Sequence, residues 1–161
     1  MKYILIEGDG MADYPIPELG GKTPLMVADI PHMNEIASKG SSGLMRTIPE
    51  GFPPGSEVAN LSIVGDEPAK YFTGRGPLEA AAMGVSLGPN DLAVRCNLVF
   101  EEGGKIADYA GGHLSSEDGK KIMDLVNQKF SVPGKIEFYP GVSYRNLLVL
   151  RGKEYSNKVK Y

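Results

Sequence analysis

Residues 49–55, Pro-Glu-Gly-Phe-Pro-Pro-Gly, constrain the fold more strongly than any other part of the chain. Three prolines and two glycines in seven residues remove backbone donors and favour turns, so this segment can be neither a helix nor a central strand. Similar clusters of glycine and proline at residues 8–10, 15–21 and 74–77 separate the periodic segments. This distribution predicts functional loops on a regular scaffold rather than a linker or a low-complexity region.

The composition bounds the class of protein. The 161 residues are enough for one ordinary domain, or for a core with a small second lobe. The 42% hydrophobic and 23% charged residues fit a soluble globular protein, and the net charge of −3 indicates no nucleic-acid partner. No apolar run approaches the roughly 18 residues of a membrane helix, and the single cysteine, Cys96, cannot form an internal disulfide. We therefore expect a cytoplasmic protein without nucleic-acid or membrane partners, in which Cys96 is a packed thiol.

The first ninety or so residues predict short strands and helices that begin at prolines or at a serine. Residues 2–6 and 43–47 have the composition of strands, and the glycines around Asp9 end the first of them abruptly. Because ligands bind beyond the carboxyl ends of strands in open α/β sheets, Asp9 is expected in a ligand-binding loop. Thr23 is a predicted N-cap. Helices are predicted to begin at Pro24, Pro31, Ser56 and Pro77, with Pro77 as the first helical residue.

The last third of the chain predicts a compact α+β lobe. Residues 92–100 form a predicted strand, followed by a hairpin turn at 101–104 and a second strand at 105–107. Ser115 is expected to cap a long helix, and two more strands are expected at 135–139 and 146–150. The apolar stripe of that helix is predicted to consist of Ile122, Leu125, Val126 and Phe130. Residues 151–161 are polar and basic and are expected to be a connector.

Asp9 and Ser56 are the strongest candidates for chemistry. A carboxylate between two glycines is free to coordinate a hard cation, although an Asx turn would explain it equally well. Ser56 follows a rigid Pro-Pro-Gly approach and begins a predicted helix, where free N–H groups and the helix dipole favour an anion. Such a serine can be a nucleophile if a base or a metal activates it, or simply an N-cap. By itself Ser56 fits a cap better, and a second acidic loop carrying Asp9 shifts the balance toward a nucleophile.

Three further residues carry weaker signals. Arg75 lies in a Gly-rich loop before a helix, where its guanidinium could bind a phosphate or remain on the surface. His113 follows two glycines and is open to a ligand or substrate role, whereas His32 favours a structural or exposed role. A two-metal phosphoryl-transfer site needs several more Asp and His ligands than these residues supply. We therefore expect that the chain does not assemble such a site alone.

Several long motifs resemble a known family. They are Glu-Gly-Asp-Gly-Met-Ala-Asp, Gly-Gly-Lys-Thr-Pro-Leu, Pro-Pro-Gly-Ser-Glu-Val-Ala-Asn-Leu, Tyr-Phe-Thr-Gly-Arg-Gly-Pro-Leu-Glu-Ala and Arg-Cys-Asn-Leu. In this order they resemble the archaeal type of cofactor-independent phosphoglycerate mutases, members of the alkaline phosphatase superfamily. The resemblance implies an α/β fold with a partial alkaline-phosphatase-like parallel sheet core, residues 1–91, a small α+β substrate-binding lobe, residues 92–151, and a truncated connector, residues 152–161.

The resemblance also implies the chemistry. It implies interconversion of 3- and 2-phosphoglycerate in glycolysis, with Ser56 as the phosphorylated nucleophile and metal-bridging group and Asp9 as a metal ligand. It implies two divalent metal ions (manganese, zinc or magnesium), no organic cofactor and a small phosphorylated substrate, and it leaves a homo-oligomer open. The remaining ligands are expected beyond Tyr161, so the chain looks like an N-terminal fragment, about the first two-fifths of the family length, that is inactive alone.

The lobe departs from the plain archaeal pattern. Where mutases of this type carry an arginine-rich stretch, this chain has Tyr109 and His113, and residues 138–145 are closer to a bacterial branch proposed to include homoserine kinases. Arg75, His113 and Arg145 are the substrate-binding candidates. Three alternatives stay open: a mutase, a homoserine kinase-like phosphotransferase on the same core, and a catalytically inactive fragment.

Overall fold

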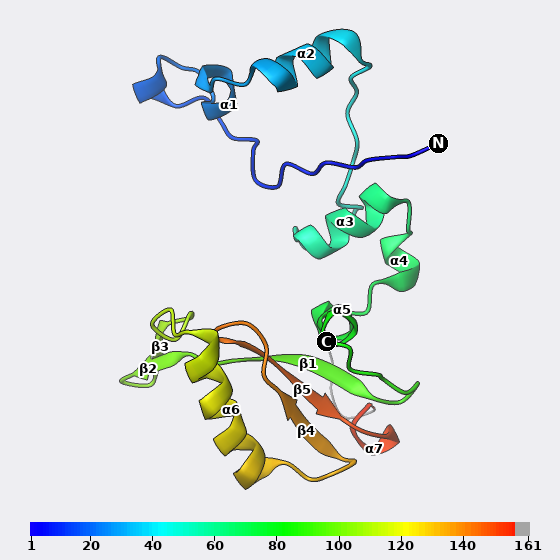
Figure 1. Cartoon of the computed structure of the whole chain (residues 1–161), viewed down its shortest axis with the longest axis vertical. Coiled ribbons are helices and arrows are strands. Elements are labelled where there is room, and N and C mark those ends of the chain that lie inside the picture. Colours follow the sequence, from blue (N-terminus) through cyan, green and yellow to red (C-terminus); the bar gives the residue numbers. More distant parts are fainter. Residues whose placement is uncertain (157–161) are drawn as a thin grey trace. The chain divides into compact units, whose positions relative to one another are not determined.

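The computed structural model describes residues 1–156 and divides into two compact units, Met1–Phe72 and the part of the chain from Thr73 onward. Figure 1 shows that the first unit is built of helices and irregular segments, whereas the strands belong to the second unit. Within the described residues, no helix is both long enough and apolar enough to cross a bilayer.

The first unit contains short helices whose starts follow from local chemistry. They are the 3-10 helix η1 (Pro17–Leu19) and the α-helices α1 (Pro24–Val27), α2 (Pro31–Lys39), α3 (Ser56–Val64) and α4 (Pro68–Tyr71). A proline occupies the first helical position of all but α3, where its fixed φ and missing N–H cost nothing. The Thr23 hydroxyl accepts the Met26 N–H at 3.3 Å, so the predicted cap of α1 is confirmed.

The strands expected at residues 2–6 and 43–47 are absent from the described structure. Both segments lack strand pairing, and their apolar side chains are exposed, with Ile4 at 85% and Ile6 at 84%. A strand is stable only when neighbouring strands satisfy its backbone groups and cover its faces, and no described segment does so here. The sheets that do form in residues 1–156 are small and antiparallel, so the expected parallel core is not seen there.

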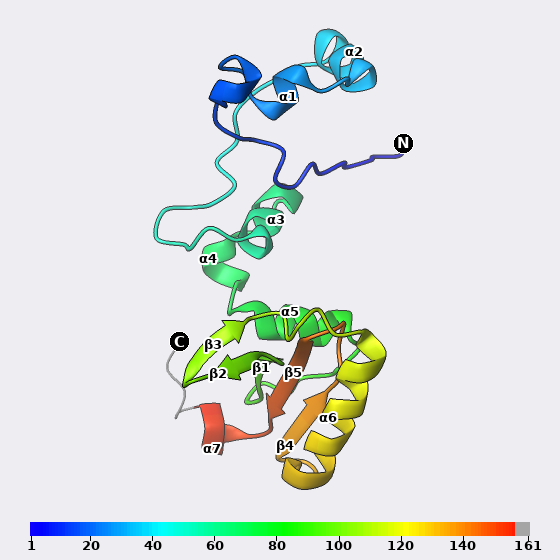
Figure 2. The same cartoon turned by 90° about the vertical axis from the view of Figure 1, so that its left-hand side faces the viewer.

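The second unit is organised around a three-stranded antiparallel sheet. Its strands are β1 (Leu92–Asn97), β5 (Arg145–Leu150) and β4 (Ile136–Tyr139), with β5 in the middle (Figure 2). The register pairs Leu92 with Leu150 at one end of the sheet and Asn97 with Arg145 at the other. Strands expected at 135–139 and 146–150 are thus confirmed to within one residue.

The predicted strand at 92–100 is broken in two. β1 ends at Asn97, and β2 (Phe100–Glu102) pairs instead with β3 (Lys105–Asp108) in a separate two-stranded ribbon. The hairpin turn between β2 and β3 is confirmed, because Gly103 and Gly104 both adopt the positive φ that such a turn requires. The lobe therefore has one more strand than the sequence predicted.

Helix α5 (Arg75–Ala82) packs on one face of the sheet. Ala80, which is fully buried, contacts the cluster formed by Ala93, Leu147 and Val149. Gly76 brings the helix against β1, since a Cβ on this residue would lie 1.8 Å from the Ala93 carbonyl oxygen. The helix begins two residues before the predicted start, so Pro77 is its third residue rather than its first.

Replacing Gly76 with alanine should destabilise the second unit. Alanine favours a helix over glycine by about 1 kcal/mol, but an added methyl that meets backbone costs 1–3 kcal/mol or more, so we expect a net loss of about 2 kcal/mol. Gly88→Ala is the matched control, because its Cβ would meet only ordinary contacts with Asp91, the nearest at 3.4 Å. Urea unfolding of both variants measures the effect. A Gly76→Ala protein as stable as the parent would contradict the close packing of α5 on β1.

Helix α6 (Ser116–Phe130) lies along the outer edge of β4. The Asn127 side chain donates to the Phe138 carbonyl at 2.8 Å and accepts the Phe138 N–H at 3.3 Å, replacing a missing strand neighbour. The predicted cap is confirmed, because Ser115 Oγ accepts the Asp118 N–H at 3.1 Å. The predicted apolar stripe is only partly correct. Met123 is the buried hydrophobic residue of α6, Val126 is half-buried, and Ile122, Leu125 and Phe130 are exposed.

Arg151, which follows β5, contacts two other parts of the second unit. Its Nη1 lies 2.7 Å from Asp91 Oδ2, and its Nη2 lies 2.7 Å from Glu137 Oε2. Its guanidinium also donates to the Tyr139 hydroxyl at 3.1 Å and to the Ser86 carbonyl at 2.7 Å. Arg151 therefore links β4 to the loop before β1.

The unit boundary lies between Phe72 and Thr73. The boundary at 91/92, drawn from the sequence, remains a prediction about the larger domains. Within the segment that the sequence assigned to a connector, the structure has a short helix, α7 (Lys153–Ser156). Residues 157–161 of that segment lie outside the described residues.

Candidate functional site

Ser56 and Asp9 come together in the first unit. The Ser56 hydroxyl donates a hydrogen bond to Asp9 Oδ2 at 3.2 Å, across 47 residues of sequence. Ser56 is the first residue of α3 and directly follows the Pro- and Gly-rich segment 49–55. Asp9 lies in a turn beside Gly10, whose φ of +69° an L side chain rarely adopts. Both side chains are exposed, so a small molecule can reach them.

The structure excludes one of the two explanations for Ser56, the N-cap. Gly55 is the N-cap of α3, and no side chain makes a capping hydrogen bond there. The Ser56 hydroxyl is therefore not a cap and is directed to a carboxylate instead. A hydroxyl at a helix start beside a carboxylate has the surroundings of a nucleophile that attacks an anionic group, because the helix N-terminus stabilises negative charge.

The Ser56–Asp9 pair fits part of a metal site. A carboxylate and a hydroxyl oxygen are hard donors of the kind that Mg²⁺ and Mn²⁺ bind. Among residues 1–156, however, no three His, Cys, Asp or Glu side chains group closely enough to hold an ion. The described residues thus offer two donor groups and not a complete coordination sphere.

The other site candidates lie in the second unit. Arg75 is the first residue of α5. His113 has a φ of +55° in a loop that the Asp108 carboxylate holds by accepting the Ala110 N–H at 2.7 Å and the Gly112 N–H at 3.0 Å. Arg145 begins β5. Each of these residues lies at the start of an element or in a loop, where side chains can reach a ligand.

Arg145 is held by an aromatic residue that sequence reasoning did not single out. Its Cζ lies 5.2 Å from the centre of the Tyr144 ring, and its Nε donates to the Tyr144 hydroxyl at 3.3 Å. Tyr144 in turn makes an edge-on contact with Tyr109, with ring centres 6.3 Å apart. A cation over an aromatic face keeps its charge while its position is restrained.

The loops that carry His113 and Arg145 are tied together. The Ser143 hydroxyl donates to the Leu114 carbonyl at 2.6 Å, and the Ser143 N–H donates to the Ser116 hydroxyl at 3.0 Å. Ser143 itself has a φ of +57°, which is uncommon for a residue other than glycine. The only sequence signal for this arrangement is the run Val-Ser-Tyr-Arg, and it does not reveal the partners.

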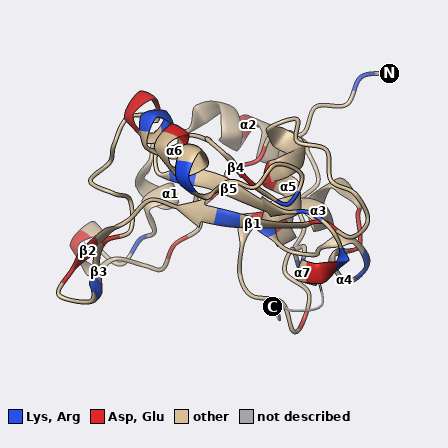
Figure 3. Cartoon of the chain, turned by 90° about the horizontal axis from the view of Figure 1, so that it is seen from below, with Lys and Arg blue, Asp and Glu red and all other residues tan. Residues whose placement is uncertain are grey.

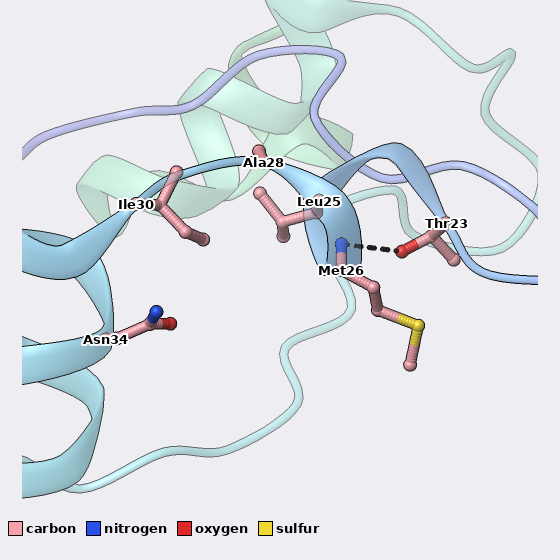
Figure 4. A pocket seen from close by; sticks show the side chains of 6 residues that line it. All are labelled: Thr23, Leu25, Met26, Ala28, Ile30 and Asn34. Atoms are coloured by element: carbon pink, nitrogen blue, oxygen red, sulfur yellow. Dashed lines mark hydrogen bonds between the residues drawn. The ribbon is translucent and has the colours of Figure 1, made fainter. Parts of the chain in front are cut away.

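Two pockets of similar size differ in chemistry. One, of about 310 Å³ in the first unit, is lined mostly by apolar side chains around α1, and its threonine already caps that helix (Figure 4). The other, of about 300 Å³, lies in the second unit and has two charged lining residues, Glu79 and Arg145. The second pocket is the better candidate for a charged ligand.

The remaining predictions concern residues outside the candidate site. Cys96 is half-buried in β1, and burial raises the pKa of its thiol, as expected for a packed cysteine. His32 is exposed near the start of α2, which agrees with its predicted role. Figure 3 shows both charge signs interspersed along α6, where Lys120 and Lys121 pair with acidic side chains one turn away.

The fold has solved counterparts. The structure of the cofactor-independent phosphoglycerate mutase from Thermoplasma acidophilum matches 89% of this chain with a TM-score of 0.52 at 30% identity, over 37% of that protein. A protein from Pyrococcus horikoshii matches 88% of the chain with a TM-score of 0.70 at 31% identity, over 35% of its own length. The described residues thus carry part of the mixed α/β fold of cofactor-independent phosphoglycerate mutases.

Sequence comparison leads from this class to a family. The family model of 2,3-bisphosphoglycerate-independent phosphoglycerate mutase matches residues 37–160. The protein of that name from Methanosarcina acetivorans is 54% identical over 149 residues, which are 92% of this chain and 37% of the relative. The chain belongs to the 2,3-bisphosphoglycerate-independent phosphoglycerate mutase family, as its motifs indicated. It spans little more than a third of the length of that relative.

Proposed function

We propose that this chain is the N-terminal part of a metal-dependent phosphoglycerate mutase in which Ser56 carries the phosphoryl group between the 3- and 2-hydroxyls of glycerate. The observation that supports this most directly is the Ser56–Asp9 hydrogen bond of 3.2 Å at the start of α3. Family membership supplies the reaction, and this contact supplies a candidate for the nucleophile.

The proposed reaction has two transfers through the same oxygen. Ser56 Oγ attacks the phosphorus of 3-phosphoglycerate, and the bond between phosphorus and the 3-oxygen breaks. The serine proton is transferred to the 3-oxygen of glycerate, so that phosphoserine remains. The 2-hydroxyl of the retained glycerate then attacks the phosphoserine, the bond between phosphorus and Ser56 Oγ breaks, and the proton of the 2-hydroxyl returns to Oγ, which gives 2-phosphoglycerate and the free serine. The Asp9 carboxylate orients the hydroxyl before the first attack, because it accepts the Ser56 hydrogen bond.

Two divalent ions, manganese, zinc or magnesium, are part of this proposal. Asp9 and Ser56 would contribute to holding them, and the bound ions would lower the pKa of the hydroxyl and neutralise the charge of the transferred group. The remaining ligands are expected from the part of the relatives that this chain does not span. In the second unit, Arg75, His113 and Arg145 are the proposed contacts to the substrate anion.

The parallel core also belongs to this proposal. Residues 2–6 and 43–47 have the composition of buried strands yet expose their side chains, as with Ile4 and Leu44. Covering these side chains would be favourable by about 25 cal/mol for each Å² of apolar surface buried. We propose that both segments join a parallel sheet in a protein of the relatives' length. A cytoplasmic location belongs to the same proposal, and a homo-oligomer stays open.

A paired assay tests the function. A protein of the relatives' length should convert 3-phosphoglycerate in a coupled enolase assay with added manganese, and should not consume ATP with homoserine. Turnover of homoserine without mutase turnover would favour the kinase-like alternative. The 161-residue chain alone should show little or no turnover under the same conditions, and robust mutase activity of that chain would contradict the incomplete metal site.

A further inference from the structure

One pocket of the second unit brings together two opposite charges that do not pair. Glu79 of α5 and Arg145 of β5 both line the pocket of about 300 Å³, together with Gly141 and the apolar residues Ala82, Met83 and Val142. Opposite charges that line one pocket attract one another, and solvent weakens this attraction here because Arg145 is exposed. Yet in the described part of the chain no ion pair joins Glu79 to Arg145. The Glu79 carboxylate is instead paired with another group.

That group is Arg95 in β1. Its Nε lies 3.1 Å from Glu79 Oε1. Nε is fully buried and has no hydrogen-bond partner among the described residues, so its contact with Glu79 is an ion pair. The side chains of Arg95 and Glu79 are 23% and 33% exposed, so salt screens this pair less than a pair of fully exposed charges.

The strand register places both arginines on the same face of the sheet. Arg95 is opposite Leu147 and Arg145 is opposite Asn97, so the two arginines sit on adjacent strands two residues apart in register. Residues two apart on a strand point to the same side. This is the face that α5 covers, since Leu147 belongs to the cluster with Ala80. Glu79 thus has two arginines within its neighbourhood, and the structure pairs it with Arg95.

Arg145 keeps its anion-binding atoms available. Its Nε donates to the Tyr144 hydroxyl, and its guanidinium lies over the Tyr144 ring. Within residues 1–156, its two terminal nitrogens make no hydrogen bond or ion pair. Those two nitrogens form the fork that binds a carboxylate or a phosphate in a bidentate manner.

We propose that Arg95 is a positioning residue that holds Glu79 away from Arg145, so that Arg145 can bind a small anion in this pocket. Glu79, Arg95 and Arg145 together carry one net positive charge, which favours a carboxylate or a phosphate. The ligand class rests on the proposed function, since phosphoglycerate carries both groups. Arg95 itself does not contact the ligand; it acts by occupying the carboxylate that would otherwise neutralise Arg145.

A double-mutant cycle that neutralises Arg95 and Glu79 tests this proposal. The binding of 3-phosphoglycerate to the full 161-residue chain is measured by calorimetry or NMR titration, with inorganic phosphate as a second probe. Arg95→Gln should weaken binding about tenfold, equivalent to 1.4 kcal/mol, because Glu79 then pairs with Arg145. Glu79→Gln should bind no more weakly than the parent. The double variant should recover to within about threefold of the parent, because its competing carboxylate is gone.

Further variants separate positioning from direct contact and from misfolding. Arg95→Lys keeps the charge and should bind nearly as well as the parent. Lys135→Gln removes the same charge next to the end of β4 that is farther from Arg145 in the register, and should leave binding unchanged. If Arg95→Gln lost the NMR dispersion of the lobe, the double variant would carry the test, because it leaves no carboxylate without its cation, and binding about tenfold weaker than the parent in that variant would count against the proposal.

Three outcomes would overturn the proposal. The first is unchanged binding in Arg95→Gln, and the second is a double variant as weak as Arg95→Gln, which would make Arg95 a direct ligand or a purely structural residue. The third is a lack of saturable binding of either probe to the unaltered chain. Because no turnover is measured, any of these results would leave phosphorylation of Ser56 to be judged by its own assay.

Discussion

Replacing Ser56 with alanine should lower the mutase turnover of an enzyme of the relatives' length by at least about 10⁴-fold, the scale seen when a catalytic nucleophile is removed. The hydroxyl that donates to Asp9 is the proposed attacking oxygen, and alanine has no replacement for it. Transfer of ³²P from labelled 3-phosphoglycerate to the protein, followed by mass spectrometry of the peptide that contains Ser56, would measure the lost phosphoserine directly.

The same substitution should barely affect folding. Because Gly55 and not Ser56 caps α3, we expect a change below about 0.5 kcal/mol in the free energy of unfolding, compared with about 1 kcal/mol for a lost serine cap. Ser62→Ala is the matched control, since Ser62 lies on the same helix and its hydroxyl only donates to the Val58 carbonyl. Full activity in Ser56→Ala, accompanied by a clear loss of stability, would return Ser56 to a capping role.

Arg151→Met should destabilise the second unit strongly, with an expected loss of about 3 kcal/mol in the free energy of unfolding at pH 7. The substitution keeps much of the side-chain volume but leaves Asp91 and Glu137 without their cation. The figure is set at the low end for buried pairs because the Arg151 side chain is 21% exposed. Lys129→Met, on the exposed end of α6, should cost less than about 0.5 kcal/mol.

The loss should depend on pH in a defined direction. The hydrogen bond from Arg151 is the main cause that lowers the pKa of Asp91 below its ordinary 3.8, whereas the Tyr139 hydroxyl, and then Arg151, lower that of Glu137 below 4.5. Carboxylates with a lowered pKa in the folded state stabilise it above the ordinary pKa and lose this effect as the pH falls through the folded value. The stability difference between parent and Arg151→Met should thus be full at pH 6–7 and shrink below about pH 4. A difference that stayed constant down to pH 2 would contradict the role of these ion pairs.

Local signals in the sequence were reliable where a single residue determines the backbone. Prolines mark the first residues of α1 and α2, and Ser115 caps α6, because a fixed φ or a capping oxygen acts on the adjacent backbone alone. The order of strands and helix in the lobe was also predicted nearly in full. The break between β1 and β2 was missed, since composition does not show where a strand exchanges one partner for another.

The predictions that failed concern segments whose apolar side chains can be covered only by another element. Residues 2–6 have strand composition but no neighbour among the described residues. The stripe of α6 was assigned from periodicity, yet the helix sits on the edge of β4 and buries Met123 instead of Ile122 and Leu125. Periodicity shows which face of a helix is apolar but not which part of that face another element covers.

The sequence by itself determined that Ser56 begins a helix and that Asp9 lies in a glycine turn, because glycine, proline and capping preferences act within a few residues. Its motifs also determined the family. Only the tertiary structure decided that the Ser56 hydroxyl meets Asp9 rather than capping α3, and that Glu79 pairs with Arg95 rather than with Arg145. Both choices depend on side chains distant in sequence that meet at hydrogen-bonding or ion-pair distance, and no local preference specifies which partner is reached.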